Sequence, residues 1–257
     1  MKFIVFDVET VGIRDEAIAL AEPYKNYEPL PPFDPKAVPV GNLKDPDKIA
    51  AKIRKVEEAY PETVKKHEEA YEKGKSEYEA KIVSSAAQNA LCGRVVAIGI
   101  NDGENENILS GNEAEILKQF WESFTATNLP FVGFNCNGLD IPFVVRRSWK
   151  LGVVVPNVFN GRFLDKRFID LVEVFGCGVW GYKVTLANLA KFFETQGKFE
   201  GDCTKETFAQ NFESTDPVAK QNAVAYLKCN LRAIWAIAEK LLSVPKTEVK
   251  KDENPFG

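Results

Sequence analysis

Two acidic residues near the start of the chain could do metal chemistry. Asp7 and Glu9 directly follow the apolar run that begins at Phe3. Alternate side chains of a strand point to the same face, so a strand here projects both carboxylates together near its end. Neighbouring carboxylates repel each other, and a divalent metal with oxygen ligands is the usual way to hold them together. A polar strand end that faces water also explains the pair, so further carboxylates must decide.

The elements that must position such a pair lie after residue 93. Apolar runs predict buried strands there, and apolar residues at helical spacing predict helices between them. The predicted strands cover 94–100, 108–109, 131–135 and 168–171, and the predicted helices cover 112–124, 141–151, 185–193 and 217–242. Asn112 with Glu115, and Asp216 with Pro217, mark two of the helix starts. This order predicts an α/β fold in which a mixed sheet carries helices on both sides.

Residues 13–92 depart from this pattern and are predicted to form an insertion after the first strand. The stretch 13–46 holds seven prolines, which indicates an extended loop that is either ordered by contacts or mobile. Residues 47–90 are rich in Glu, Lys and Ala and carry a narrow apolar stripe, which predicts helix. Because Pro61 should break or kink that helix, a helical hairpin is expected. His67 lies on the stripe and is expected to pack or to face solvent rather than to catalyse.

Composition limits the class of protein. The 257 residues are 45% hydrophobic and 27% charged with a formal net charge of −4, which fits one large soluble domain with an added lobe. No apolar stretch is long enough to cross a membrane and no signal peptide is visible, so a cytoplasmic protein is expected. The single histidine excludes histidine-rich metal sites and argues against a Ser–His–Asp triad. The cysteines lack paired metal spacing and are expected to be reduced and mostly buried: Cys92, Cys136, Cys177, Cys203 and Cys229.

Three segments resemble the motifs of a known nuclease family. The stretch from Asp7 to Thr10 resembles the first motif of the DEDD, proofreading-type 3′–5′ exonucleases. The segment 132–143 resembles their second motif, in which an aspartate, here Asp140, follows an apolar strand and an asparagine-containing loop. The stretch from Tyr226 to Asn230 resembles the third motif of the tyrosine branch, where the last residue is an aspartate. The resemblance excludes only the insertion and the tail, and it is closest to stand-alone exonucleases of phages and bacteria.

This resemblance implies a fold and a chain organisation. Members of the family have an RNase H-like fold, so a mixed five-stranded sheet flanked by helices is expected, with the helical insertion after its first strand. The core would comprise residues 1–12 and 93–242, and the insertion residues 13–92. Residues 243–257 would form a frayed tail.

The resemblance also implies two-metal hydrolysis of phosphodiester bonds. Asp7 would bridge two Mg²⁺ or Mn²⁺ ions, and Glu9 would bind the ion that activates water. Asp140 would hold the second ion. Tyr226 would orient the attacking water, and Asn230 occupies the position of the remaining metal ligand.

The expected substrate is the 3′ end of a nucleic acid, with single-stranded DNA favoured over RNA by resemblance alone. Thr10 and Asn135 are expected to contact it. Residues 47–90 would flank the nucleic-acid cleft or contact a protein partner, and a solvated decoration is the alternative. The slight acidity of the chain argues against nonspecific coating of nucleic acid but leaves room for a local basic groove.

Purely structural explanations stay open for several of these residues. Taken alone, Asp140 before a proline-containing helix start is a helix N-cap. Tyr226 alone is a half-buried packing residue. Asp170 is interpreted as a strand-end carboxylate without a ligand role.

Asn230 divides the functional prediction in two. A neutral amide oxygen coordinates only weakly, so the site of the water-activating ion should be weakened. The asparagine is either a substitution made to block turnover or a natural residue that leaves a slow or purely binding protein. The two function classes are a metal-dependent 3′–5′ exonuclease, impaired in this version, and a nucleic-acid-binding or scaffold protein with a degenerate site. Because Asp7, Glu9, Asp140 and Tyr226 are all kept, the enzyme is favoured.

Overall fold

A mixed five-stranded sheet forms the centre of the protein. We describe it in a computed structural model that covers residues 1–160, 163–179, 181–195 and 199–242; the predicted tail, 243–257, lies outside these residues. The sheet has the order β3-β2-β1-β4-β7, with β1 antiparallel to β2 and parallel to β4. Its strands are β1 (Ile4–Gly12), β2 (Gly93–Asn101), β3 (Glu106–Leu109), β4 (Phe131–Gly133) and β7 (Phe168–Asp170). The predicted α/β, RNase H-like sheet is therefore confirmed.

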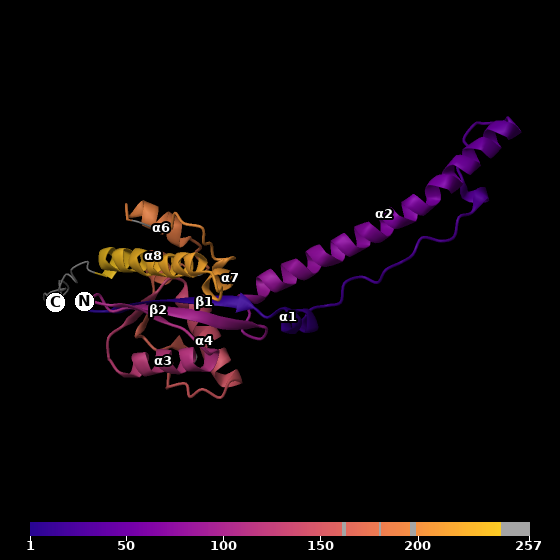
Figure 1. The fold of residues 1–257 in the computed structure, drawn as a ribbon. Helices are drawn as coiled ribbons and strands as arrows, with labels where there is room; N and C mark the ends of the chain where they lie inside the picture. The colour runs from indigo at the N-terminus through magenta and orange to yellow at the C-terminus, as the bar shows by residue number, and fades with distance from the viewer. Residues whose placement is uncertain (161–162, 180, 196–198, 243–257) are drawn as a thin grey trace, which may run out of the picture.

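Helices cover both faces of this sheet (Figure 1). One layer contains α3 (Glu113–Thr125) and α4 (Ile141–Lys150), and the other contains α5 (Leu171–Phe175), α6 (Leu186–Phe192), α7 (Phe208–Phe212) and α8 (Pro217–Leu242). The alternation of β1 explains the two layers, because Phe6 and Val8 pack in the cluster of α3 and α4 while Val5 packs with α8. A short hairpin of β5 (Phe159–Asn160) and β6 (Phe163–Leu164) lies outside the main sheet.

The predicted starts of three helices are confirmed by their caps. Asn112, Thr185 and Asp216 each accept a hydrogen bond from a backbone N–H in the following turn, at 2.9, 3.2 and 3.0 Å. The helix after Asn112 then presents Ile116, Leu117, Phe120, Trp121 and Phe124 to the core. The periodicity of the sequence was sufficient here because each of these helices buries one continuous apolar face.

Two local predictions after the first strand are corrected. β1 does not end near Glu9 but continues to Gly12, with a bulge between Glu9 and Thr10. The predicted loop also contains a helix, α1 (Arg14–Leu20), which buries Ala17, and a 3₁₀ turn, η1 (Pro35–Ala37). Both departures follow from contacts with residues far along the chain, which the local pattern does not contain.

The predicted helical hairpin is wrong. Residues Pro46–Ala86 form one continuous helix, α2, which passes through Pro61 and extends away from the sheet (Figure 1). Proline removes one backbone hydrogen bond from a helix interior and usually breaks or kinks it. Here the flanking turns are held by residues 21–40, which run back along α2 and which we call the strap.

The strap lies on the predicted apolar stripe of α2 through a repeating set of hydrogen bonds. The hydroxyls of Tyr78 and Tyr71 donate to the carbonyls of Glu22 and Lys25, at 2.6 and 3.0 Å. The His67 ring lies 2.9 Å from the Glu28 carbonyl, and the Tyr60 hydroxyl reaches the Pro31 carbonyl. The strap contacts thus recur every three residues, which is the repeat of a polyproline II helix. His67 is a packing residue, as predicted, and the proline-rich stretch is ordered by contacts. Together, α2 and the strap form what we call the arm.

The base of the arm is closely joined to β1 and β2. A Cβ atom at Gly12 would lie 2.8 Å from Cβ of Ala86, and one at Gly93 would lie 2.5 Å from the Ala86 carbonyl oxygen. Only glycine permits this approach at either position. The hydroxyl of Thr10 adds a hydrogen bond of 2.5 Å to the carbonyl of Ala87.

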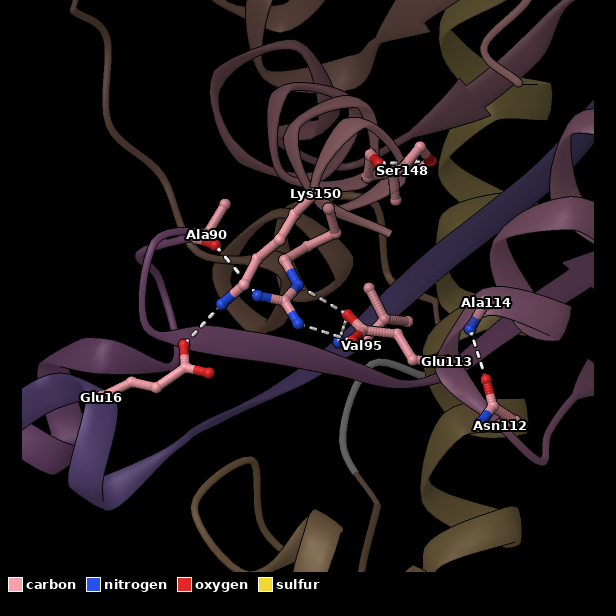
Figure 2. Close-up of polar contacts among 10 residues, drawn as sticks. Glu16, Ala90, Val95, Asn112, Glu113, Ala114, Ser148 and Lys150 are labelled. Atoms are coloured by element: carbon pink, nitrogen blue, oxygen red, sulfur yellow. Dashed lines mark hydrogen bonds and ion pairs between the residues drawn. The ribbon is translucent and has the colours of Figure 1, made fainter. Parts of the chain in front are cut away.

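A buried ion pair fixes the segment between the arm and β2. Arg147 of α4 and Glu113 of α3 form a bidentate pair, with N–O distances of 2.8 and 2.7 Å. Figure 2 shows Glu113 beside Val95, whose backbone N–H it also accepts at 2.8 Å, and Lys150 paired with Glu16 of α1. Sequence patterns did not indicate this network, because an arginine inside a helix is usually exposed.

Candidate active site

The face of β1 that carries Asp7 and Glu9 is covered by α8. Asp7 lies opposite Gly99 of β2, where a Cβ atom would meet Leu231 at 2.8 Å and Leu227 at 3.1 Å. The missing side chain at Gly99 therefore lets α8 pack closely against the sheet. This packing brings α8 residues directly over the two carboxylates.

Tyr226 and Asn230 are the α8 residues that reach the carboxylates. The Asn230 side-chain amide donates a hydrogen bond from Nδ2 to Oδ2 of Asp7 at 3.0 Å. Tyr226 lies one turn earlier on the same side of the helix. Burial, together with the nearby Glu9 carboxylate, raises the pKa of the Tyr226 hydroxyl, so this group stays protonated at neutral pH.

Asp140 joins the same cluster from the segment that follows β4, the parallel neighbour of β1. It closes a π-helical turn, η2 (Cys136–Asp140), directly before α4. Its side chain makes no capping hydrogen bond, although the residue occupies the N-cap position. Burial and the neighbouring Asp7 charge raise the pKa of Asp140 well above its ordinary range. The carboxylate is thus not used as a cap and faces Asp7.

Glu9 completes a set of three crowded carboxyl groups. It is only 5% exposed, and burial followed by the charge of Asp7 raises its pKa well above the ordinary value. Burial also raises the pKa of Asp7, against the hydrogen bond from Asn230. The structure therefore brings together Asp7, Glu9, Asp140, Tyr226 and Asn230, and their catalytic roles stay predictions.

Sequence reasoning missed Lys205, which lies in the loop before α7. Its positive charge partly offsets the rise in the pKa of Asp7, Glu9 and Asp140, so it lies within electrostatic range of all three carboxyl groups. The loop has neither periodicity nor a motif of the resemblance, and the chain has 33 lysines and arginines. No local signal distinguished this lysine from the others.

The chemistry of the donor set fits a hard divalent cation. Three carboxylates and one amide oxygen are the ligand types that Mg²⁺ and Mn²⁺ prefer, and a cation would relieve the repulsion that raises the carboxyl pKa values. Within the described ranges, however, no three His, Cys, Asp or Glu side chains are grouped closely enough to hold a metal ion as they stand. The Asn230 amide presents its N–H rather than its oxygen toward Asp7. The two predicted ions stay a prediction.

The two predicted substrate contacts lie in different settings. The hydroxyl of Thr10 is engaged with Ala87 at the arm base. Asn135 adopts a left-handed backbone, with φ of 57°, and its backbone N–H donates to Oδ1 of Asp170 at 2.9 Å. Asp170 also accepts the N–H groups of Asn137 and Val172, so its structural interpretation is supported by three hydrogen bonds. The roles of Thr10 and Asn135 toward substrate stay predictions.

Two hollows open beside the cluster and share Lys205. One, of about 720 Å³, contains Tyr226 and Asn230; its other lining residues include Leu186 and Ala187 of α6. The second, of about 590 Å³, lies between the arm base and α7 and includes Thr10. The first hollow therefore reaches the cluster through Tyr226 and Asn230, and the second lies next to it through Thr10, which follows Glu9.

Comparisons with known proteins show the family of the chain. Residues 77–216, just over half of the chain, match the family described as "Predicted 3'-5' exonuclease related to the exonuclease domain of PolB". No curated protein matches the sequence. Among solved structures, the family B DNA polymerase from the hyperthermophilic archaeon Pyrobaculum calidifontis is similar, with a TM-score of 0.49 and 19% identity. That match covers 58% of this chain and 22% of the polymerase chain.

None of the helices in the described part of the chain is both long and apolar enough to cross a bilayer.

Proposed function

Because this chain belongs to the family of predicted 3′–5′ exonucleases related to the exonuclease domain of PolB, we propose that it removes nucleotides from the 3′ ends of nucleic acids. The observation that carries the proposal is the convergence of Asp7, Glu9 and Asp140 with two α8 residues in one crowded cluster. Such a concentration of buried negative charge costs stability, and active sites are where such costs are kept. We further propose that the protein belongs to the tyrosine branch of the DEDD exonucleases.

We propose that the acidic cluster binds two Mg²⁺ or Mn²⁺ ions. Asp7, Glu9 and Asp140 would hold the ions, and Asn230 would offer its amide oxygen after its side chain turns over. Bound ions would activate a water molecule and stabilise the leaving oxygen.

The protein's own groups would then position the reactants. Tyr226, which stays protonated because its pKa is raised, would donate its hydroxyl hydrogen toward the attacking water or the scissile phosphate. Lys205 would attract the substrate phosphate to the hollow that it lines, because its positive charge acts on the carboxyl groups of the cluster. Burial of the carboxylates strengthens each of these charge interactions.

A second candidate is a nucleic-acid-binding protein with an impaired site. The observation in its favour is the hydrogen bond from Asn230 to Asp7, which ties up a carboxylate that would hold the ions. In that case the cluster would be a relic, and binding would depend on the hollows and on Lys205.

We further propose single-stranded DNA as the preferred substrate. The five free thiols favour a reducing compartment such as the cytoplasm. We keep the predicted division into a core of residues 1–12 and 93–242 and an insertion of residues 13–92, and we propose residues 47–90 as the surface for a protein partner.

The test is nucleotide release from a 5′-labelled single strand by the wild-type protein and two variants, with Mg²⁺, with Mn²⁺ and with EDTA. Asn230→Asp should raise metal-dependent release by roughly 10- to 100-fold, the range typical of a group that supports a bound metal. Asp7→Asn, of matched size, should abolish it. If Asn230→Asp gains no metal-dependent activity while all three proteins still bind the strand, the binding-protein candidate is correct.

A further inference from the structure

Four aromatic side chains gather on the α5–α6 hairpin, on the same side of the sheet as the acidic cluster. Phe175 lies at their centre, and its ring centroid is 5.9 Å from that of Tyr182, 5.4 Å from Phe192 and 6.0 Å from Phe193. Phe192 is 67% exposed and Tyr182 is 40% exposed. We call this group the aromatic surface. Two of its rings thus present much of their area to solvent although neighbours hold them in place.

The aromatic surface and the candidate active site share helix α6. Helix α6, which carries Phe192, also contributes Leu186 and Ala187 to the hollow that contains Tyr226 and Asn230. Helix α5, which carries Phe175, is joined to the loop before Asp140 by a hydrogen bond of 3.0 Å from Asn137 to Glu173. Both ends of the hairpin are therefore anchored to elements that form the site.

Positive charges flank the exposed rings. Lys183 follows Tyr182, and Lys191 precedes Phe192; both lysines are exposed. Neither has an ion pair with another residue in the portion of the chain that the structure covers. Alternating aromatic rings and lysines are how proteins bind unpaired nucleic-acid strands, since rings stack on bases and ammonium groups pair with phosphates.

We propose that the aromatic surface stacks unpaired bases of the nucleic-acid strand whose 3′ end occupies the acidic cluster. This inference rests on the proposed function and adds the reason for a single-stranded substrate. Bases of a duplex are already stacked on one another and cannot present a face to Tyr182 or Phe192, so the surface would select unpaired strands. It would act on binding and not on the hydrolytic step.

A second pair of exposed aromatic residues supplies the matched control. Trp149 and Phe159 stack at 6.3 Å and are 61% and 42% exposed. They lie at the end of α4 and in β5, and α4 covers the opposite face of the sheet from α6 (Figure 1). Loss of these rings removes a similar apolar area away from the site.

The experiment compares the wild-type protein with three double variants in EDTA, so that no strand is cut. Fluorescence anisotropy measures the affinity for a labelled oligothymidylate, a matched duplex and a dinucleotide. Tyr182→Ala with Phe192→Ala should weaken oligothymidylate binding by roughly 30-fold or more, as expected for two stacked bases. Tyr182→Phe with Phe192→Tyr should keep it, and Trp149→Ala with Phe159→Ala should not change it. The dinucleotide, which fills only the cluster, should not distinguish the proteins.

Each outcome bears on a different part of the proposal. If the wild-type protein binds no strand at all, the proposed function itself fails. If it binds oligothymidylate and the alanine variant at the aromatic surface binds it equally well, only the stacking surface is refuted. Analytical ultracentrifugation of the same proteins detects the other occupant: a wild-type dimer that this alanine variant loses would make the surface an interface between copies, and would overturn the proposal.

Discussion

Asn230→Asp should destabilise the metal-free protein and make its stability depend on metal. The Asn230 amide now donates to the Asp7 carboxylate over 3.0 Å, and it is the one strong hydrogen bond that Asp7 receives from another side chain in the described residues. Replacing the amide by a carboxylate removes this donor and adds a like charge at the same place. The new charge therefore destabilises the metal-free protein and stabilises the folded state only when a cation is bound.

The size of the effect follows from that distance. A hydrogen bond to a charged acceptor contributes roughly 1.5–3 kcal/mol. Two carboxylates about 3 Å apart repel by roughly 5–6 kcal/mol at an effective dielectric constant of about 20. Uptake of one shared proton relieves most of that repulsion, so we expect a net loss of about 2–4 kcal/mol at neutral pH. For a chain of this size the loss lowers Tm by roughly 5–15 °C.

Differential scanning calorimetry with EDTA measures the loss of stability in the metal-free variant, and the same scan with saturating Mg²⁺ or Mn²⁺ measures the stabilisation by metal. A metal concentration about 100 times the Kd should return about 2.7 kcal/mol to Asn230→Asp. Asn230→Ala is the control: it loses the hydrogen bond but gains no charge, so metal should return much less. If Asn230→Asp melts with the wild-type protein in EDTA, and metal raises the Tm of both equally, then residue 230 does not face a cation site and the reasoning is wrong.

Three further perturbations test other parts of the structure. Arg147→Ala leaves the Glu113 carboxylate buried without its partner and should cost about 3–5 kcal/mol in urea unfolding, while Arg147→Lys should recover only part of it; a loss below about 1 kcal/mol would contradict the buried pair. Pro61→Ala should raise the free energy of unfolding by about 1–3 kcal/mol, because it restores a backbone hydrogen bond inside a continuous helix; a loss of helical circular dichroism would show that the proline is needed. Burial raises the pKa of Glu9 and Asp140, so the folded protein binds protons that the unfolded chain has released. In EDTA the free energy of unfolding should therefore fall as pH rises from about 4 toward neutrality. Glu9→Gln should make this fall shallower, and a free energy of unfolding that rises with pH in the wild-type protein would contradict the raised pKa values.

The sequence was sufficient for the residues whose placement depends on local periodicity. The spacing of two between Asp7 and Glu9 puts both on one face of β1, and the spacing of four between Tyr226 and Asn230 puts both on one side of α8. The apolar run that begins at Phe3 fills both faces of β1, which is why helices are expected on either side of it. These rules need no knowledge of distant segments.

The failures share a different physical cause. The rule that proline breaks helices is local, whereas α2 is kept continuous across Pro61 by contacts with the strap, which lies some thirty residues earlier along the chain. Lys205 lies within electrostatic range of the carboxylates because α7 packs on α8, a tertiary fact without a periodic signature. The π-helical turn that ends at Asp140 likewise depends on a distant residue. The backbone N–H groups of Asn135 and Asn137 donate to the side chain of Asp170, which lies in β7.

In the arm, helix α2 and the strap cover the same length with different numbers of residues. Between Tyr60 and Tyr78, α2 advances about 27 Å at about 1.5 Å per residue. Between Glu22 and Pro31, a polyproline II segment advances about 28 Å at about 3.1 Å per residue. The hydrogen bonds between α2 and the strap stay aligned because the rise of one strap residue equals the rise of about two helical residues. An arm of a different length would therefore need changes in both α2 and the strap, with about two residues of helix added or lost for each residue of strap. An insertion or deletion in only one of the two would misalign every hydrogen bond between α2 and the strap beyond it. Among natural relatives, the lengths of the helix and of the strap should therefore change together in a ratio of about two to one.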